Sequence, residues 1–182
     1  MTVETKEYYG SGPSSATITH LKHRTDDDYT NDTTHPIPKP AAGSNYGYWK
    51  HIALYDATGN NTDIFSDIKI YGTDPSWTGV TLYIGDETFD VASYDQATGT
   101  INETGDELVT AHAAVTAKTN FWSTYNSGNM KTVGVIGGAE NVKPASPQLI
   151  SKIVTFQAAV GTGASAGSLA NGTITWRYSV TS

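Results

Sequence analysis

Apolar and polar residues alternate at every second position along much of the chain. The longest alternating run covers residues 150–160, and similar runs cover 48–55, 64–71, 80–85 and 173–180. Successive side chains of a strand point to opposite faces of a sheet, so a period of two is typical of strands with one buried face. We therefore expect these five segments to be β-strands. In 64–71 the apolar face should consist of Ile64, Ile68 and Ile70.

Weaker patterns predict three further elements and one pairing. Residues 16–23 alternate enough to form a strand, and Val133–Ile136 could form a short one. Residues 107–118 are the best candidate for a helix, because apolar residues recur there at i, i+3 and i+7. A Gly- and Ser-rich stretch at 161–172 separates the last two strands, so we expect 150–160 and 173–180 to pair as an antiparallel hairpin.

Two segments lack strand patterning, and we expect both to be extended arms. Residues 1–15 are polar and end in GSGPSS, which indicates an N-terminal arm or edge. Residues 24–45 form a long loop that contains Pro36, Pro38 and Pro40. Alternating prolines favour an extended chain and cannot donate to a central sheet. A loop of this length is unusual inside a compact domain, so we expect it to reach a neighbouring molecule.

Composition strengthens the case for an all-β fold. Only 16% of the residues are charged, and the chain contains 27 Thr, 11 Tyr and 18 Gly. Thr and Tyr suit a half-buried pleated surface, and Gly suits tight turns. We expect six to eight strands in an antiparallel two-sheet sandwich, jelly-roll-like in its connections. This single domain would span 16–182, with the long loop at 24–45 and the arm at 1–15.

Charge and the absence of cysteine exclude several classes of function. The net charge is −7, so a sequence-independent grip on nucleic acid and a polybasic membrane contact are both disfavoured. No apolar run reaches the length of a membrane span, and the first residues do not resemble a secretion signal. The chain has no cysteine, which excludes disulfides, thiolate zinc sites, iron–sulfur clusters and a cysteine nucleophile.

The histidines do not form a recognisable catalytic or metal-binding pattern. His20 and His23 are three apart, which places them on opposite faces of a strand, and His35 and His51 stand alone. His112 follows Asp106 and Glu107, but no nucleophile elbow or zinc-binding pair accompanies it. We therefore expect no enzyme, no catalytic residues, no metal and no cofactor.

Two acidic segments are candidates for calcium binding. Asp26, Asp27 and Asp28 are adjacent, and three adjacent carboxylates on an extended chain cannot all face one ion. A solvated acidic loop, neutralised in part by Lys22, His23 and Arg24, is the favoured reading. Residues 56–63, DATGNNTD, offer Asp56, Asn60, Asn61 and Asp63 but lack the EF-hand spacing, which favours a turn.

Four tryptophans, Trp49, Trp77, Trp122 and Trp176, together with the tyrosines could form a platform for stacking sugars. Packing in the core is the favoured reading, because aromatic side chains bury large areas and Trp49 and Trp176 lie within strongly alternating strands.

Three blocks of the sequence together resemble structural proteins of tailed bacteriophages. The first is residues 21–54, where the acidic loop and spaced prolines lead into an aromatic strand beginning Tyr46-Gly47-Tyr48-Trp49-Lys50, followed by FSDIKIYGTD at 65–74. The second is YDQATGTINETGDEL at 94–108, and the third is the end of the chain, with its T-W-R-Y segment. The chain departs from the family at Ser179, where an acidic residue is usual.

The resemblance implies a β-sandwich virion component without catalytic residues. We expect it on the capsid surface as a decoration or at the head–tail neck, where it would stabilise the particle. Its partners would be other virion proteins, with homo-oligomers in the particle and no direct contact with nucleic acid or membrane. A carbohydrate-binding or host-recognition module is the alternative. A jelly-roll hydrolase is the weakest reading, since no paired carboxylates are evident.

Overall fold

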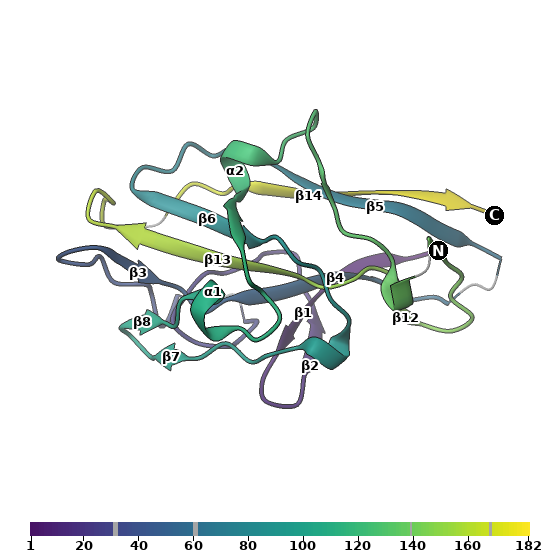
Figure 1. Cartoon of the computed structure of the whole chain (residues 1–182), viewed down its shortest axis with the longest axis horizontal. Coiled ribbons are helices and arrows are strands. Elements are labelled where there is room, and N and C mark those ends of the chain that lie inside the picture. The colour runs from purple at the N-terminus through teal and green to yellow at the C-terminus, as the bar shows by residue number, and fades with distance from the viewer. Residues whose placement is uncertain (31–32, 60–61, 139, 168) are drawn as a thin grey trace.

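The computed structural model describes residues 1–30, 33–59, 62–138, 140–167 and 169–182. The chain folds into two antiparallel sheets, with 41% of its residues in strands and 8% in helices. The all-β, two-sheet prediction is therefore confirmed. Figure 1 shows the two sheets lying face to face along the long axis of the molecule. Among the described residues, no helix has the length and apolar character needed to cross a membrane.

The larger sheet, sheet A, contains ten strands in the described part of the chain. They are β1 (Val3–Tyr9), β2 (Ser14–Thr17), β3 (Ser44–Tyr46), β4 (Lys50–Asp56), β6 (Val80–Gly85), β7 (Gly99–Thr100), β8 (Thr104–Gly105), β9 (Lys118–Asn120), β12 (Gln148–Leu149) and β13 (Val154–Gly161). Strands β4 and β13 pair with each other at its centre, β1 pairs with β4, and β6 pairs with β13.

The smaller sheet, sheet B, is built around one long strand. Its members are β5 (Ile64–Thr73), β10 (Lys131–Thr132), β11 (Asn141–Val142) and β14 (Thr173–Thr181). Strand β5 pairs with β14 along its length, and with the short strands β10 and β11. The helices among the described residues are two single turns, α1 (Leu108–Ala111) and α2 (Phe121–Thr124), and two 3₁₀ turns, η1 (Val91–Ser93) and η2 (Ile136–Gly138).

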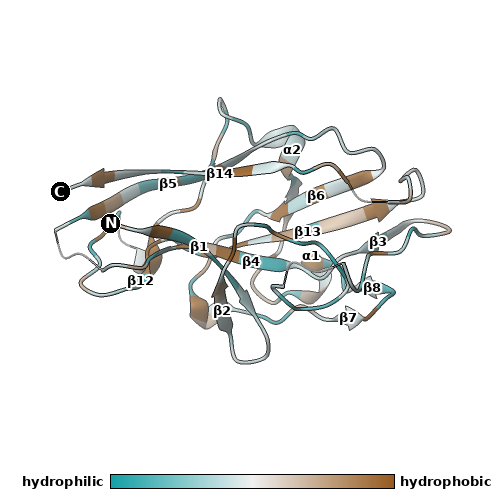
Figure 2. Ribbon diagram, turned by 180° about the vertical axis from the view of Figure 1, so that it is seen from behind, coloured by the Kyte–Doolittle hydropathy of each residue, from teal (hydrophilic) through white to brown (hydrophobic). Residues whose placement is uncertain are grey.

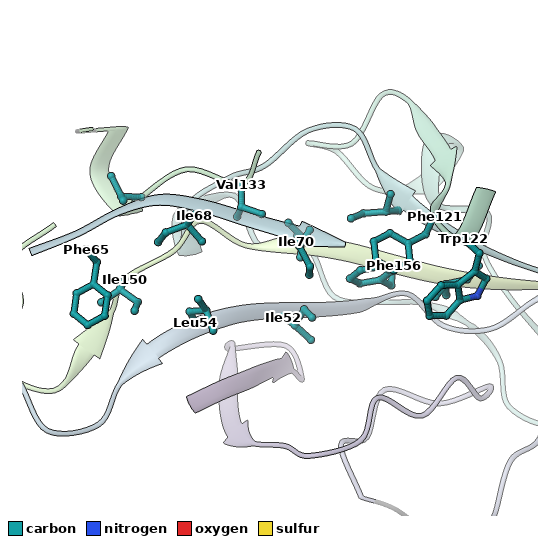
Figure 3. Close-up of a cluster of buried hydrophobic side chains, with 14 of the residues drawn as sticks. Ile52, Leu54, Phe65, Ile68, Ile70, Phe121, Trp122, Val133, Ile150 and Phe156 are labelled. Carbon is teal, nitrogen blue, oxygen red and sulfur yellow. The ribbon is translucent and has the colours of Figure 1, made fainter. Parts of the chain in front are cut away.

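The main hydrophobic core lies between the two sheets (Figure 3). Sheet A contributes Ile52, Leu54 and Phe156, which face Phe65 and Ile70 of β5. Phe121 of α2 closes one end and stacks edge-on against Phe156, with ring centroids 4.9 Å apart. Burying large apolar side chains on both inner faces is what holds a sandwich together.

A second core covers the outer face of sheet A. There Trp49 and Ala53 of the 49–53 segment pack with Phe89, Leu108 and Val115 from the irregular stretch between β6 and β9. Strands β4 and β13 are consequently buried on both faces. The molecule therefore has three layers: sheet B, sheet A and an outer layer of loops and single turns.

The first fifteen residues are not an arm. Strand β1 lies between β2 and β4, with pairs from Val3↔Asp56 to Tyr8↔His51. Its sequence, VETKEYY, hides this position because Glu7, a charged residue, occupies a buried site. The predicted 16–23 strand is shorter and earlier than expected: it ends at Thr17 as β2, which forms the edge beside β1.

The last two long strands do not form a hairpin. Strand β13 belongs to sheet A and β14 to sheet B, so the segment between them crosses from one sheet to the other. The glycine-rich connection was misleading, since it suits a crossing as well as a hairpin tip. The jelly-roll connectivity stays a prediction.

Strand β5 contains a bulge that shifts its buried face. Arg177 is opposite Lys69, but Ser179 is opposite Ser66, so β5 has one extra residue there. Asp67 takes a left-handed conformation with φ 50°. An extra residue reverses the alternation. The buried set is therefore Phe65, Ile68 and Ile70, and the prediction that Ile64 shares that face is wrong.

Two other predicted elements are also different in the structure. The helix expected over 107–118 is only the single turn α1, which ends when His112 adopts extended backbone angles. The buried Val115 lies beyond that end and packs in the outer core. The strand expected at Val133–Ile136 is reduced to one isolated bridge between Val135 and Ser151.

Candidate functional site

The acidic loop, residues 24–45, is tied to the chain's own sheet by Lys50. The Lys50 side chain is completely buried, and its Nζ donates to the main-chain oxygens of Asp28 (2.7 Å) and Asp26 (3.3 Å). Its third partner is Glu7 Oε1 of β1, 3.2 Å away. One ammonium group therefore joins β1, β4 and the acidic part of the loop, and Ile37 further along packs against the main core. The described part of the loop lies against the sandwich and does not extend from it as an arm.

The three adjacent aspartates diverge. Asp26 and Asp28 both pair with Arg24, at 2.5 Å and 3.1 Å, and Arg24 is 2% exposed. Asp27 turns the other way and accepts from the Gly10 main-chain N–H at 2.7 Å. The described residues contain no group of three His, Cys, Asp or Glu side chains placed to hold a metal ion. The expected pairing with Arg24 is present, but the loop is not simply solvated, because all three aspartates are half-buried. The role of Lys50 was not foreseen.

Burial dominates the electrostatics of this cluster. It raises the pKa of Glu7 to about 7, even though the nearby Lys50 ammonium acts in the opposite direction. Burial also raises the pKa of Asp27, against the effect of the Gly10 hydrogen bond and of Lys50. The pair between Glu7 and Lys50 thus exists at a desolvation cost, and this kind of cost makes the removal of one partner expensive.

A hollow of about 390 Å³ opens beside the acidic loop. It is lined by Asp26 and Asp27, by Tyr48 and Ala97, and by the polar side chains of Gln96 and Thr98. The Asp26 carboxylate already pairs with Arg24, and Asp27 with Gly10. The hollow could admit a small polar molecule, but its charged groups are used within the fold.

Two histidines lie buried in the outer core. The Nε2–H of His51 donates to the Asp95 carbonyl (2.9 Å), so its Nδ1 accepts from the Thr155 hydroxyl (2.8 Å). In His112, Nδ1 accepts from the Ala114 N–H (3.0 Å). These partners specify one neutral tautomer for each ring. Burial lowers the pKa of His51 to about 3 and also lowers that of His112.

The carboxylates next to His112 in sequence have other partners. Glu107 accepts from the Thr110 N–H at the start of α1 and pairs with Lys118. Asp106 accepts from the Thr98 hydroxyl at 2.6 Å. The acid–base arrangement considered for His112 is therefore not assembled, and the histidine packs instead against Phe89, with ring centroids 5.2 Å apart.

We expect the protein to lose stability as the pH falls below neutrality, because burial lowers the pKa of two histidines, His23 and His51, to about 3. A folded-state pKa of about 3 for His51 means that the fold favours the neutral ring. Its contribution is complete above the unfolded value of about 6.5 and is lost as the pH falls towards 3, by about 2 kcal/mol between pH 7 and 5. Glu7 acts oppositely, because its pKa of about 7 adds about 2 kcal/mol of stability between pH 7 and 5 and so offsets one of the two histidines.

Urea unfolding at pH 7, 6 and 5 would measure this dependence. His51→Gln should flatten the profile, and the matched change His20→Gln, at an exposed residue, should leave it unchanged. Glu7→Gln should make the loss on acidification steeper, because it removes the opposing contribution. An His51→Gln profile as steep as that of the parent would contradict the assignment.

The four tryptophans do not form one platform. Trp49 is 1% exposed and its Nε1–H donates to the Asp95 carbonyl, while Trp176 lies on the inner side of β14. Only Trp77 and Trp122 meet, edge to face, with ring centroids 5.5 Å apart. Core packing, the favoured reading, therefore holds for Trp49 and Trp122, and Trp77 and Trp176 pack against the main core. The Trp77–Trp122 pair also lies beside a small hollow.

The hollow beside these two rings is about 90 Å³ and is also lined by Asp74, Asn120 and Ser123. Trp122 is 8% exposed, and its buried Nε1 has no hydrogen-bond partner among the described residues. A Cβ at Gly72 would lie 2.3 Å from the Trp122 ring, so glycine is required there for the ring to pack. The hollow combines an aromatic wall with polar groups.

The described beginning of the second acidic segment forms a turn. Asp56 Oδ1 accepts from both the N–H and the hydroxyl of Thr58, at 3.0 Å and 2.8 Å, which is the usual hydrogen bonding of a turn that starts with aspartate. Asp63 accepts from the Ser182 hydroxyl. The other two candidate oxygen ligands, Asn60 and Asn61, lie outside the described residues.

Strand β14 is the longest strand with an open edge in the described part of the structure. It pairs with β5 on one side, from Thr173↔Thr73 to Thr181↔Ile64, and no described strand pairs with its other side. Figure 2 shows β14 beside β5 along the top of the molecule. Ile174, Trp176 and Tyr178 pack inwards, and the alternate side chains are exposed or half-buried.

The usual protections of an edge strand are lacking in β14. Edge strands are commonly short, bulged, or interrupted by proline and charged side chains, which prevent pairing with other chains. Over its nine residues, β14 has no proline, and Arg177 is its only charged residue. Its bulge lies on the partner strand β5. The edge is therefore suited to accept another strand.

Comparisons with known proteins give no relationship. The sequence matches no family model and no curated protein, and the fold matches no solved structure.

Proposed function

We propose that the protein is a structural component of a tailed-phage virion that acts through contacts with other virion proteins. Its place would be the capsid surface, as a decoration, or the head–tail neck. The single observation that carries the proposal is the open, unprotected edge of β14, because strand addition at a sheet edge is a general mode of protein association. The three sequence blocks that resemble phage structural proteins are the reason for proposing a tailed-phage particle as the assembly.

The use of the buried polar side chains supports a mechanical role. Gln157 hydrogen-bonds three main-chain groups, His51 is fixed between Thr155 and Asp95, and Lys50 joins three segments. Each of these groups is used to hold layers of the fold together. Such bonding makes a rigid body, which suits a particle component that must keep its shape.

Mass spectrometry of purified phage particles would test the proposal. We expect the protein at a fixed copy number relative to the major capsid protein. A high multiple would indicate decoration, and about a dozen copies would indicate the neck. Absence from particles, with expression in infected cells, would contradict the proposed function.

A carbohydrate-binding module is a second candidate, favoured by the hollow beside Trp77 and Trp122. Stacking a sugar face on Trp77, with hydrogen bonds to Asp74 and Asn120, would use the groups that line it. A titration of the purified protein with a panel of monosaccharides, monitored by tryptophan fluorescence, distinguishes sugar binding from the structural role. A saturable change that is lost in Trp77→Ala would favour sugar binding, and no change at millimolar sugar would exclude it.

A further inference from the structure

We propose that β14 pairs with β14 of a second copy of this chain, antiparallel and across a two-fold axis at Tyr178. This inference rests on the proposed function only for the assembly in which the pairing would take place. It names a second copy of the chain as the partner of the open edge. Antiparallel pairing of identical strands is self-complementary, since the same surface serves both copies. It would join two B sheets into one continuous sheet.

Charge favours a second copy at this edge over other faces. The chain carries −7 overall, so two copies repel one another over most of their surfaces. Strand β14 contains no Asp or Glu, and its one charge is the positive Arg177. The edge therefore brings two copies together without adding acidic groups to the contact.

The side-chain pattern restricts the register. Opposite residues of an antiparallel pair point to the same face, so inward residues must meet inward residues. An axis at Arg177 would place two like charges directly opposite each other, which is destabilising. An axis one residue further, at Tyr178, places Arg177 opposite Ser179 and Thr175 opposite Thr181.

The same axis covers the apolar group that the edge leaves exposed. Val180 is 36% exposed, although it continues the inward row of Ile174, Trp176 and Tyr178. Across the axis Val180 would lie opposite Trp176 of the second copy, and Tyr178 would lie opposite its counterpart. Aromatic and β-branched residues are favourable cross-strand partners. The axis at Tyr178 therefore both separates the arginines and buries Val180.

Disulfide trapping suits this contact, because seven opposed residues make a small interface compared with the roughly 1,600 Å² of a standard complex. The chain has no cysteine, so introduced cysteines have no competing partner. Mixing Arg177→Cys protein with Ser179→Cys protein, under mild oxidation, should give covalent dimers. Mixing Thr175→Cys with Thr181→Cys should do the same, since both pairs share the axis at Tyr178.

Three single variants serve as controls. Arg177→Cys alone would be trapped only by an axis at 177, and Thr175→Cys alone only by an axis at 175. Ser127→Cys, at an exposed residue away from β14, measures random collision. We expect at least tenfold faster dimer formation in the two mixtures than in these controls, with unchanged circular dichroism. Equal rates in all samples, or fastest trapping of a control, would overturn the proposal.

The proposal and the proposed function fail separately. Trapping is measured on purified protein and needs no phage particle. If the protein is absent from particles but the mixtures trap, the virion role fails and the homotypic strand pairing stands. If it is present in particles and the mixtures do not trap, β14 pairs with a different virion protein, and the homotypic inference fails.

Discussion

Lys50→Met should destabilise the protein by about 3–5 kcal/mol, the range measured when one partner of a buried ion pair is removed. The change leaves Glu7 buried without its cation and frees the main-chain oxygens of Asp26 and Asp28. Methionine keeps most of the side-chain volume, so lost packing contributes little. Urea unfolding at pH 7.5, where the Glu7 carboxyl is largely ionised, gives the free energy.

A double variant distinguishes the effect of the unpaired Glu7 charge from the effect of the lost hydrogen bonds to the loop. Glu7→Gln combined with Lys50→Met removes both charges, and we expect it to recover part of the lost stability. Lys152→Met, which removes a half-buried lysine elsewhere, is the matched control and should cost less than about 1 kcal/mol. A Lys50→Met protein as stable as the Lys152→Met protein would show that the ion pair contributes nothing.

Gln157→Leu should be the other large effect, at about 3–5 kcal/mol. The side-chain amide of Gln157 is fully buried: its Oε1 accepts from the Leu108 N–H, and its Nε2 donates to the carbonyls of Gly47 and Asp106. Leucine has a similar size but leaves three main-chain groups unpaired, each costing about 1–3 kcal/mol. The outer layer should therefore detach locally before the sandwich unfolds.

Amide hydrogen exchange would locate that loss. Protection should fall first in residues 106–112, with the β4–β13 ladder less affected. Gln148→Leu, at a half-buried glutamine of β12, is the control and should leave both regions protected. A uniform loss of protection across both sheets would show that Gln157 supports the whole fold and not one layer.

Strands with one buried face were predictable from the sequence. Strands β6 and β14 follow the alternating runs closely, because each has an inward apolar side and a more exposed outer side, whereas β5 follows its run only on one side of the bulge. The same reasoning failed for β1, whose buried Glu7 is matched by Lys50 on β4. An ion pair between two strands leaves no apolar signal, so neither residue is conspicuous in the sequence.

The layering could not be predicted for a related reason. An alternating pattern such as that of β13 predicts one buried face, yet Thr155 and Gln157 are buried on the other side under the outer layer. Their polarity reflects hydrogen bonds and not exposure: Thr155 bonds to His51 of β4, and Gln157 bonds to the Leu108 N–H of the outer layer. The wrong hairpin prediction for β14 has another cause, because the Gly- and Ser-rich connection after β13 suits a crossing between sheets as well as a hairpin tip.

The anchoring of the acidic loop was hidden as well. Spaced prolines and three aspartates indicated an extended, solvated segment, and only the structure shows that Lys50 of β4 lies beneath it. The open edge of β14 was equally invisible, since edge and central strands have the same alternation. Both features depend on which strands become neighbours, and that is a property of the whole fold.

The separation of the paired strands has a kinetic consequence. His51 and Thr155, on adjacent central strands, are 104 residues apart, and β5 pairs with β14 across a similar length of chain. Such long loops must close, and lose conformational entropy, before the strand contacts compensate for that loss. Folding is therefore slow, and typically takes milliseconds to seconds for β-sandwiches. Until β14 arrives, β5 is exposed along that side, so refolding at high concentration should favour misassociation over dimerisation.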